Sequence, residues 1–351
     1  MKRPAVLILL VLLSGAGCST DSDPAVEPPC TGNLVNRDSD VWHIHDPAIA
    51  KENGSYYIYS SSPLGSFYRS DDMRTWTESG RLFDALPEWA YEELVTPDHI
   101  GAPDIAWYDG QWVLYYQSHI GGTCNAGTGV ATNKTLDPED PNYEWVDHGL
   151  LLRSTPLFEG IDIICGQDEA YYNAIDAHLF IDVDGKPWMV FGSTIGGLLL
   201  AEIDPKTFAP TQHPRDFVTL AARDLLQPDP IIEGPYIIHR NGWYYLFLSH
   251  NRCCQGENTK YKILVGRSRD LKGPYVDRDG VSLMEDGGTV LIEREGTMIG
   301  TGHADVYSEG GYDYLVHHAY DRERDYESIL NIRRMDWDEE GWPSACKADE
   351  S

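Results

Sequence analysis

Residues 45–61 read HDPAIAKENGSYYIYSS, an acidic residue preceded by a histidine and followed by a short apolar strand, a glycine turn and an aromatic strand. Four later segments repeat this plan and begin at Asp104, Asp176, Glu233 and His303. Successive turn glycines are 56, 75, 57 and 69 residues apart, at Gly54, Gly110, Gly185, Gly242 and Gly311. Self-similarity at this spacing indicates a repeat architecture.

The turn dipeptides favour a β-hairpin in each repeat. Asn-Gly and Asp-Gly pairs suit type I′ turns, in which both central residues need positive φ. They occur at Asn53-Gly54, Asp109-Gly110, Asp184-Gly185 and Asn241-Gly242. Each repeat then offers a third strand, as at 129–132, 198–203, 263–268 and 329–333, and one helix is expected at 85–93. Five antiparallel sheets predict an all-β fold, a five-bladed β-propeller. The alternative, a β-sandwich, would not explain the regular recurrence of turns and polar residues.

The first strand of each propeller blade lines the central channel. The polar residue that opens each repeat should therefore reach one mouth of that channel, which would bring together Asp46, Asp104, Asp176, Glu233 and His303. Carboxylates gathered in one cavity are costly to desolvate and repel one another. Such a cluster is more typical of a functional site than of a scaffold.

Charge and hydropathy exclude several classes of protein. Of 351 residues, 56 are acidic and 27 are Lys or Arg, so the formal charge is −29. That charge would repel a phosphate backbone, which argues against a nucleic-acid partner. The long apolar run at 5–13 is too short to cross a bilayer. The length and the 42% hydrophobic content indicate a folded, acidic protein, which we expect to be a monomer.

The N-terminus carries an export signal, in which Lys2 and Arg3 precede the apolar run and a stretch of small residues. The sequence LSGAGC that ends at Cys18 resembles the bacterial lipobox, so we expect lipidation of Cys18; an ordinary signal peptide is the alternative. The protein would then be exported and held at the bacterial cell envelope, on the outer membrane or cell surface, by a lipid anchor only. We expect a lipoprotein signal peptide at 1–17, a flexible tether at 18–40 and the catalytic domain at 41–351.

Beyond Cys18, six cysteines remain, and an even number in an exported protein suggests disulfides. Cys30 and Cys346 bracket the domain and could tie its ends together. Cys253 and Cys254 would pair either with each other or with separate partners. No cysteine or histidine spacing matches a zinc site.

Converging carboxylates among aromatic residues suit glycoside hydrolysis. This reaction needs a carboxylic acid that protonates the leaving oxygen and a carboxylate that serves the other face of the sugar. The acid must keep its proton near neutral pH, and burial beside a further negative charge raises its pKa. Tyr and Trp side chains offer flat faces for sugar rings.

Several short motifs follow one another along the chain: His45-Asp46-Pro47, Ala102-Pro103-Asp104, Asn173-Ala174-Ile175-Asp176, Ile232-Glu233-Gly234-Pro235, Cys253-Cys254, Val265-Gly266-Arg267-Ser268 and Gly302-His303. In this order the sequence resembles glycoside hydrolase family 43, and within it the endo-α-1,5-L-arabinanases, over roughly residues 41–345. The separation of 130 residues from Asp46 to Asp176, and of 57 from there to Glu233, makes the resemblance specific.

The resemblance implies a five-bladed propeller that cleaves internal α-1,5-L-arabinofuranosidic links of arabinan or arabino-oligosaccharides with inversion. It implies that Asp46 is the general base, that Glu233 is the general acid and that Asp176 raises the pKa of the acid. It places His303 beside a channel-bound metal ion, usually calcium, held largely through water, as a hard cation allows. Asn173 resembles a substrate-contacting residue. Inversion predicts that the carboxyl groups of Asp46 and Glu233 lie about 6.5–9.5 Å apart.

Some positions depart from the family pattern. Gly101 stands where arabinanases usually carry Trp, and this loss weakens one sugar-binding position unless Trp89 or Trp107 compensates. Asp104 matches a motif without occupying a catalytic position, and we expect it to bind sugar or to be structural. Further departures, which leave endo and exo action both open, are Ala177, Gly234 and Thr301.

Two alternative functions keep the predicted fold. The first is an exo-acting α-L-arabinofuranosidase or β-xylosidase on the same scaffold. The second is a non-catalytic glycan-binding lipoprotein. The spacing of Asp46, Asp176 and Glu233 weighs against the second, because a lectin does not need a proton donor.

Overall fold

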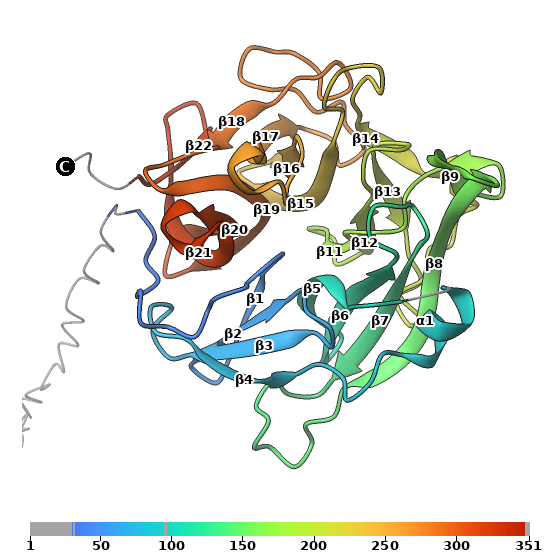
Figure 1. Ribbon diagram of the computed structural model, residues 1–351. Coiled ribbons are helices and arrows are strands. Elements are labelled where there is room, and N and C mark those ends of the chain that lie inside the picture. Colours follow the sequence, from blue (N-terminus) through green and yellow to red (C-terminus); the bar gives the residue numbers. More distant parts are fainter. Residues whose placement is uncertain (1–29, 31, 95–96, 348–351) are drawn as a thin grey trace, which may run out of the picture.

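The computed structural model describes residues 30, 32–94 and 97–347; the expected signal peptide, Cys18 and residues 19–29 of the expected tether lie outside them. Five antiparallel sheets are arranged around a central axis, as Figure 1 shows. The predicted all-β, five-bladed propeller is therefore confirmed.

Each blade consists of consecutive strands, ordered in the sheet as they occur in the sequence. Blade one has β1 (Ala48–Glu52), β2 (Ser55–Ser60), β3 (Ser66–Ser70) and β4 (Thr77–Arg81). Blade two has six strands: β5 (Gly101–Tyr108), β6 (Gln111–His119), β7 (Ala126–Asn133), β8 (Val146–Phe158), β9 (Ile161–Gln167) and β10 (Ala170–Tyr171). Blade three has β11 (His178–Ile181), β12 (Pro187–Phe191), β13 (Leu198–Glu202) and β14 (Val218–Ala221).

Blade four has β15 (Ile232–Arg240), β16 (Trp243–His250), β17 (Lys262–Ser268) and β18 (Thr289–Ile292), and blade five has β19 (Met298–Glu309), β20 (Tyr312–Asp321), β21 (Glu327–Trp337) and β22 (Pro343–Ala345). The four predicted third strands correspond to β7, β13, β17 and β21. The expected helix is shorter than predicted: α1 (Glu88–Glu93). Single turns of 3-10 helix occur at η1 (Pro214–Asp216), η2 (Gly256–Asn258) and η3 (Arg322–Arg324).

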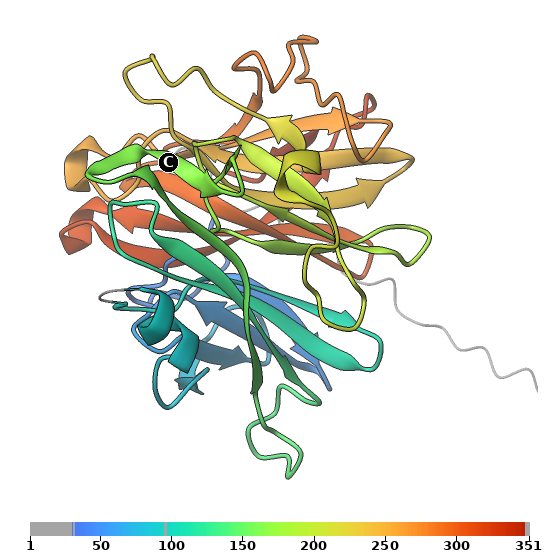
Figure 2. The same cartoon turned by 90° about the vertical axis from the view of Figure 1, so that its right-hand side faces the viewer.

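The helix α1 and the hairpin of β8 and β9 lie on one side of the ring. In Figure 2, α1 and the hairpin of β8 and β9 both project from the side that faces the viewer in Figure 1. The Cys124–Cys165 disulfide joins the loop between β6 and β7 to this hairpin. Among the described residues, no helix is long and apolar enough to cross a membrane.

The hairpin turns follow the prediction with one exception. At Asn53-Gly54, Asp109-Gly110 and Asn241-Gly242 both residues have positive φ, as type I′ turns require. At Asp184-Gly185 only the glycine does, so the predicted type I′ turn is wrong there. The loop between β11 and β12 runs from Asp182 to Lys186, and its longer length needs a left-handed residue at one position only.

The hydrophobic core lies between neighbouring blades. Inner strands have a blade on each side, so both of their faces are buried; all six residues of β2, SYYIYS, are buried. Tyr59 of blade one packs in a cluster with Leu114 of blade two, and Ile58 with Val316 of blade five. Aromatic and β-branched residues therefore fill these strands without strict alternation, because burial and pleated packing favour them at every position.

The N-terminal segment helps to close the ring between blades five and one. The backbone N–H of Leu34 donates to the carbonyl of Ile332, and the side chain of Asn33 bonds to the backbone of β21. Cys30 forms the predicted disulfide with Cys346. Residues 33–40, which the sequence analysis assigned to the tether, thus lie against the propeller.

Loss of the Cys30–Cys346 bond should destabilise the ring, because the bond closes a loop of 316 residues in the unfolded chain. Replacing both cysteines by serine should lower the free energy of unfolding by about 2–5 kcal/mol, measured by urea denaturation. The same change at Cys124 and Cys165, 41 residues apart, is the matched control and should cost less in the chain-entropy account. Equal losses from the two pairs would contradict ring closure as the cause.

Candidate active site

Each blade begins with one residue in the left-handed conformation at the mouth of the central channel. These residues are Asp46, Ala102, Asp176, Gly234 and His303, with φ between 34° and 59°. A non-glycine side chain rarely adopts this conformation, and such strain concentrates at functional sites. Asp104 lies two residues after Ala102, the left-handed residue of its blade. Glu233 lies one residue before Gly234, the left-handed residue of its blade.

The mouth holds a cavity of about 270 Å³ that four of the five predicted residues line. Asp46, Asp176, Glu233 and His303 meet there, although 257 residues separate the first from the last. Asp104 does not line it; it lies deeper in the channel, in a smaller cavity that it shares with Asp176 and His303. The remaining lining residues are His45, Ser61, His99, Gln117, His119, Ile175, Cys253, Cys254 and Tyr261.

Donors and histidines surround the carboxylate of Asp46. Ser61 Oγ donates to Oδ2 at 2.6 Å, while His45 Nδ1 and His303 Nδ1 lie 2.9 and 3.3 Å from Oδ1. Burial by itself would raise the pKa of Asp46, but the neighbouring histidines, His45 first, outweigh it and hold the pKa well below its usual value. Asp46 is therefore ionised across the neutral and mildly acidic range.

Glu233 has the opposite electrostatic environment. Burial raises the pKa of its carboxyl, although hydrogen bonds from Tyr261 and Ser193 oppose the shift. Ser193 Oγ donates to Oε2 at 3.0 Å. The ring of Tyr261 reaches Glu233 because Gly302 lies against it: a Cβ on Gly302 would come within 1.8 Å of the ring.

Asp176 sits between these two carboxyl groups. Its Oδ2 accepts a hydrogen bond from the N–H of Gly234 at 3.0 Å, and its own N–H donates to Gln117 Oε1 at 2.5 Å. Burial raises the pKa of Asp176 to about 7, with the charge of His303 opposing and that of Glu233 adding to the shift. The cavity thus combines one carboxylate kept ionised with two carboxyl groups that tend to hold a proton, which is the arrangement that general acid–base catalysis needs.

Asp104 belongs to a buried layer below the mouth. Its oxygens accept hydrogen bonds from His178 Nδ1 and the N–H of Leu179, both at 2.8 Å. Across the channel, Asp305 accepts from the N–H of Ile49 at 2.7 Å. These contacts tie neighbouring first strands together, and they favour the structural role over sugar binding for Asp104.

The other predicted contact residues are dispersed. Trp107 lies five residues along β5 from Ala102, about 17 Å from the mouth at the rise of an extended strand, and its side chain is exposed there. Trp89 is buried on α1, where its Nε1 donates to Tyr116. Neither replaces an aromatic side chain at Gly101. Asn173 is partly exposed near the mouth, and its Oδ1 accepts a hydrogen bond from Ser154 Oγ.

Sequence analysis assigned no role to several residues that contact the carboxyl groups of Asp46 and Glu233. His45 was part of a quoted motif, but adjacency in sequence does not show that its ring turns back onto Asp46. Ser61, Ser193 and Tyr261 carry no recognisable signal, because hydroxyl groups follow many strands. Ring closure brings them to the cavity from blades one, three and four.

Comparisons with known proteins bear on this site. The sequence matches the glycosyl hydrolases family 43 over residues 42–343. It is 36% identical over 310 residues to the extracellular exo-α-(1→5)-L-arabinofuranosidase ArbA of Cellvibrio japonicus, covering 86% of this chain and 85% of that protein. It is 33% identical over 306 residues to the extracellular endo-α-(1→5)-L-arabinanase 1 of Bacillus subtilis, covering 86% and 87%. The solved exo-1,5-α-L-arabinanase from a bovine ruminal metagenomic library gives a TM-score of 0.80 at 37% identity, covering 88% and 98%.

Gly302→Ala should displace Tyr261 from Glu233, because the added methyl group overlaps the Tyr261 ring. Overpacking of this kind costs about 1–3 kcal/mol, which urea denaturation would measure. Gly121→Ala is the control, since nothing lies within 4 Å of a Cβ there. A fully stable Gly302→Ala protein would show that Tyr261 does not depend on this contact.

Proposed function

The chain belongs to glycosyl hydrolase family 43, and we propose that it hydrolyses internal α-1,5-L-arabinofuranosidic links of arabinan with inversion. The opposed pKa shifts of Asp46 and Glu233 in one cavity carry this proposal. They supply an acceptor and a donor of protons to opposite faces of a glycosidic bond. The arabinan-active relatives support the choice of sugar.

In this mechanism Asp46 takes a proton from the attacking water while Glu233 protonates the leaving oxygen. Ser61 and His45 hold the carboxylate of Asp46, and Ser193 and Tyr261 hold the carboxyl of Glu233. Once Asp176 ionises, its negative charge beside Glu233 favours the protonated form of Glu233. The expected separation of about 6.5–9.5 Å between the carboxyl groups of Asp46 and Glu233 leaves room for that water.

Exo action is the second candidate, because two of the compared proteins are named as exo-acting enzymes. Product analysis on linear, debranched arabinan separates the two modes. A ladder of oligosaccharides at early times supports endo cleavage. Release of one small product from the start would indicate exo cleavage and contradict endo cleavage. Turnover of aryl-xylosides without arabinan hydrolysis would indicate a β-xylosidase.

We also propose that the enzyme is exported and anchored through Cys18, since two relatives are named as extracellular enzymes. An anchor suits an enzyme whose polymeric substrate is too large to import. Metabolic labelling with a fatty-acid analogue tests it: wild-type protein should be labelled and Cys18→Ala should not. If neither protein is labelled, Cys18 is not lipidated and the N-terminus is an ordinary signal peptide.

We also propose that a calcium ion binds in the channel beneath the mouth, where a cavity of about 10 Å³ has room for one water-sized sphere. Asp104, Asp305 and His303 line it. Nδ1 of His303 faces Asp46, and its Nε2 has no hydrogen-bond partner among the described residues. The carboxylates already accept hydrogen bonds, so His303 would be a direct ligand, and water in the larger cavity above, which His303 also lines, would complete the shell of a hard cation. Once bound, the ion would supply positive charge beneath the catalytic carboxyl groups.

Glu233→Gln should abolish turnover and preserve binding, because the amide keeps the shape of the side chain and cannot donate a proton as an acid. We expect kcat on arabinan to fall by about 10²–10⁴-fold, with arabino-oligosaccharide affinity little changed by calorimetry. Asp46→Asn should behave alike. If wild-type protein binds arabinan and never cleaves it, the glycan-binding alternative holds instead.

The pH profile of kcat/KM should be a broad bell. Activity requires Asp46 ionised and Glu233 protonated, so the acid limb should lie well below the usual carboxylate range and the basic limb above it. Asp176→Asn removes a neighbouring negative charge, which should lower the pKa of Glu233 and move the basic limb to lower pH. If the basic limb does not move, Asp176 does not raise the pKa of Glu233.

Chelation tests the calcium proposal. Treatment with EDTA should lower both the melting temperature and arabinan turnover, and added Ca²⁺ should restore both, because a ligand that binds only the folded state stabilises it. In His303→Ala protein, chelation should have much less effect. An unchanged wild-type melting temperature after verified metal removal would contradict the site.

A further inference from the structure

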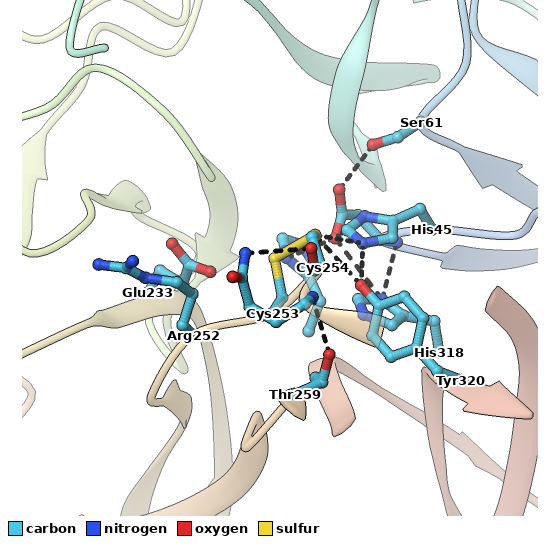
Figure 3. The surroundings of a disulfide bond; sticks show 12 residues. His45, Ser61, Glu233, Arg252, Cys253, Cys254, Thr259, His318 and Tyr320 are labelled. Carbon is cyan, nitrogen blue, oxygen red and sulfur yellow. Dashed lines mark hydrogen bonds and ion pairs between the residues drawn. A yellow bond between two sulfur atoms is a disulfide. The ribbon is translucent and has the colours of Figure 1, made fainter. Parts of the chain in front are cut away.

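A chain of contacts connects Asp46 to the far wall of the cavity. His45 Nδ1 lies 2.9 Å from Asp46 Oδ1, and His45 Nε2 lies 2.7 Å from the hydroxyl of Tyr320. That hydroxyl accepts a hydrogen bond from the backbone N–H of Cys254 and lies 3.2 Å from Cys254 Sγ. Figure 3 shows His45, Tyr320 and Cys254 turned toward one another beside the Cys253–Cys254 disulfide.

The chemistry of these groups determines the direction of the first contact. An ionised carboxylate has no hydrogen to give, so His45 Nδ1 must donate to Asp46. At the other end, the Tyr320 hydroxyl can donate to a neutral ring or accept from a charged one. The ring of His318 stacks on His45 with centroids 4.0 Å apart, and His318 Nδ1 accepts from the N–H of Asp46 at 3.1 Å. His45 is thereby held at its edge and at its face.

We propose that Tyr320 and Cys254 hold His45 as positioning residues, and that His45 in turn aims the carboxylate of Asp46 at the attacking water. The vicinal disulfide forms the wall from which this chain starts, since Cys253 and Cys254 both line the cavity. This inference rests on the proposed role of Asp46 as the base. It explains why residues from blades one, four and five converge behind a carboxylate that already has a donor in Ser61.

Two substitutions at His45 separate its two contacts. Asn places an amide N–H near the position of Nδ1 and so preserves the bond to Asp46, whereas Gln reaches toward Tyr320 and loses that bond. We expect His45→Gln to lower kcat on arabinan at least tenfold more than His45→Asn does, with similar KM values. Tyr320→Phe should lower kcat by a smaller factor. Melting temperatures identify variants whose losses come from unfolding.

Equal kcat values for the Asn and Gln variants, both folded, would overturn the proposal, as would a Tyr320→Phe enzyme with wild-type kcat. A crystal structure of His45→Gln gives a readout that does not need turnover, since the carboxylate of Asp46 should be rotated relative to the wild type. An inactive wild-type enzyme would refute the proposed function. The crystal structure of His45→Gln would still test the positioning chain.

A second, independent observation concerns a groove of about 390 Å³ between blades four and five. Three cations, Lys260, Lys262 and Arg294, line it, and none forms an ion pair with a described residue. In a chain of formal charge −29 such a group of unpaired cations is unexpected. The other lining residues are Asn251, Thr259, Tyr261, Glu293 and Gly300.

The groove lies next to the cavity at the channel mouth, since Tyr261 lines both. We infer that it binds the carboxylate groups of an acidic polysaccharide, such as a polymer of uronic acids. Lys and Arg recognise carboxylates through charge-assisted hydrogen bonds. A concave groove fits a chain of sugars better than a flat anionic membrane. The inference does not depend on hydrolysis, since it concerns binding alone.

Polygalacturonate is the probe, titrated by calorimetry at low ionic strength. The variant Lys260→Gln/Lys262→Gln/Arg294→Gln should bind it at least tenfold more weakly, and wild-type binding should weaken with added salt. A control with the same charge loss, Lys186→Gln/Arg269→Gln/Lys272→Gln, alters the opposite face and should bind more tightly than the groove variant. Hydrolysis of neutral arabino-oligosaccharides should be unaffected by the groove variant. Equal affinities for the two variants, or binding to vesicles with anionic lipid in place of the polymer, would overturn the groove as a polysaccharide site.

Discussion

Closure of five sheets around one axis is the constraint on which the site depends. It brings Asp46 and His303, which are 257 residues apart in sequence, to 3.3 Å. The N-terminal segment on blade five and the Cys30–Cys346 bond support this closure. The same packing buries both faces of the inner strands, and the channel mouth is left as a place where polar groups from every blade can meet.

The gathering of carboxyl groups at the channel mouth is electrostatically unfavourable for the stability of the fold. Three carboxyl groups lie in one cavity, in a chain that is already strongly acidic. Burial raises the pKa of Glu233 and Asp176, whereas the histidines around Asp46 lower its pKa. Left-handed backbone at Asp46, Asp176 and His303 adds conformational strain. The blades' packed cores must offset these costs, and the gain is a donor and an acceptor of protons a short distance apart.

The channel is layered, and the two layers have different tasks. At the mouth, side chains face the cavity and differ in protonation. Two residues further along the strands, Asp104 and Asp305 bond to neighbouring strands and hold the blades in place. The proposed positioning chain lies behind Asp46, and the basic groove lies beside Tyr261, where we propose that an acidic polysaccharide binds.

Sequence by itself determined the number of blades, most hairpin turns, and the gathering of the carboxyl groups of Asp46, Asp176 and Glu233. Turn glycines and aromatic strands are local signals, because φ preference and burial act on short segments. Only the tertiary structure decided which residue of each repeat faces the axis. Asp104 resembles Asp46 in its segment, yet a shift of two residues along an extended strand moves a side chain a full layer down the channel, about 7 Å. The rings and hydroxyl groups around Asp46 and Glu233 likewise come from blades far apart in sequence, so only the closed ring could reveal them.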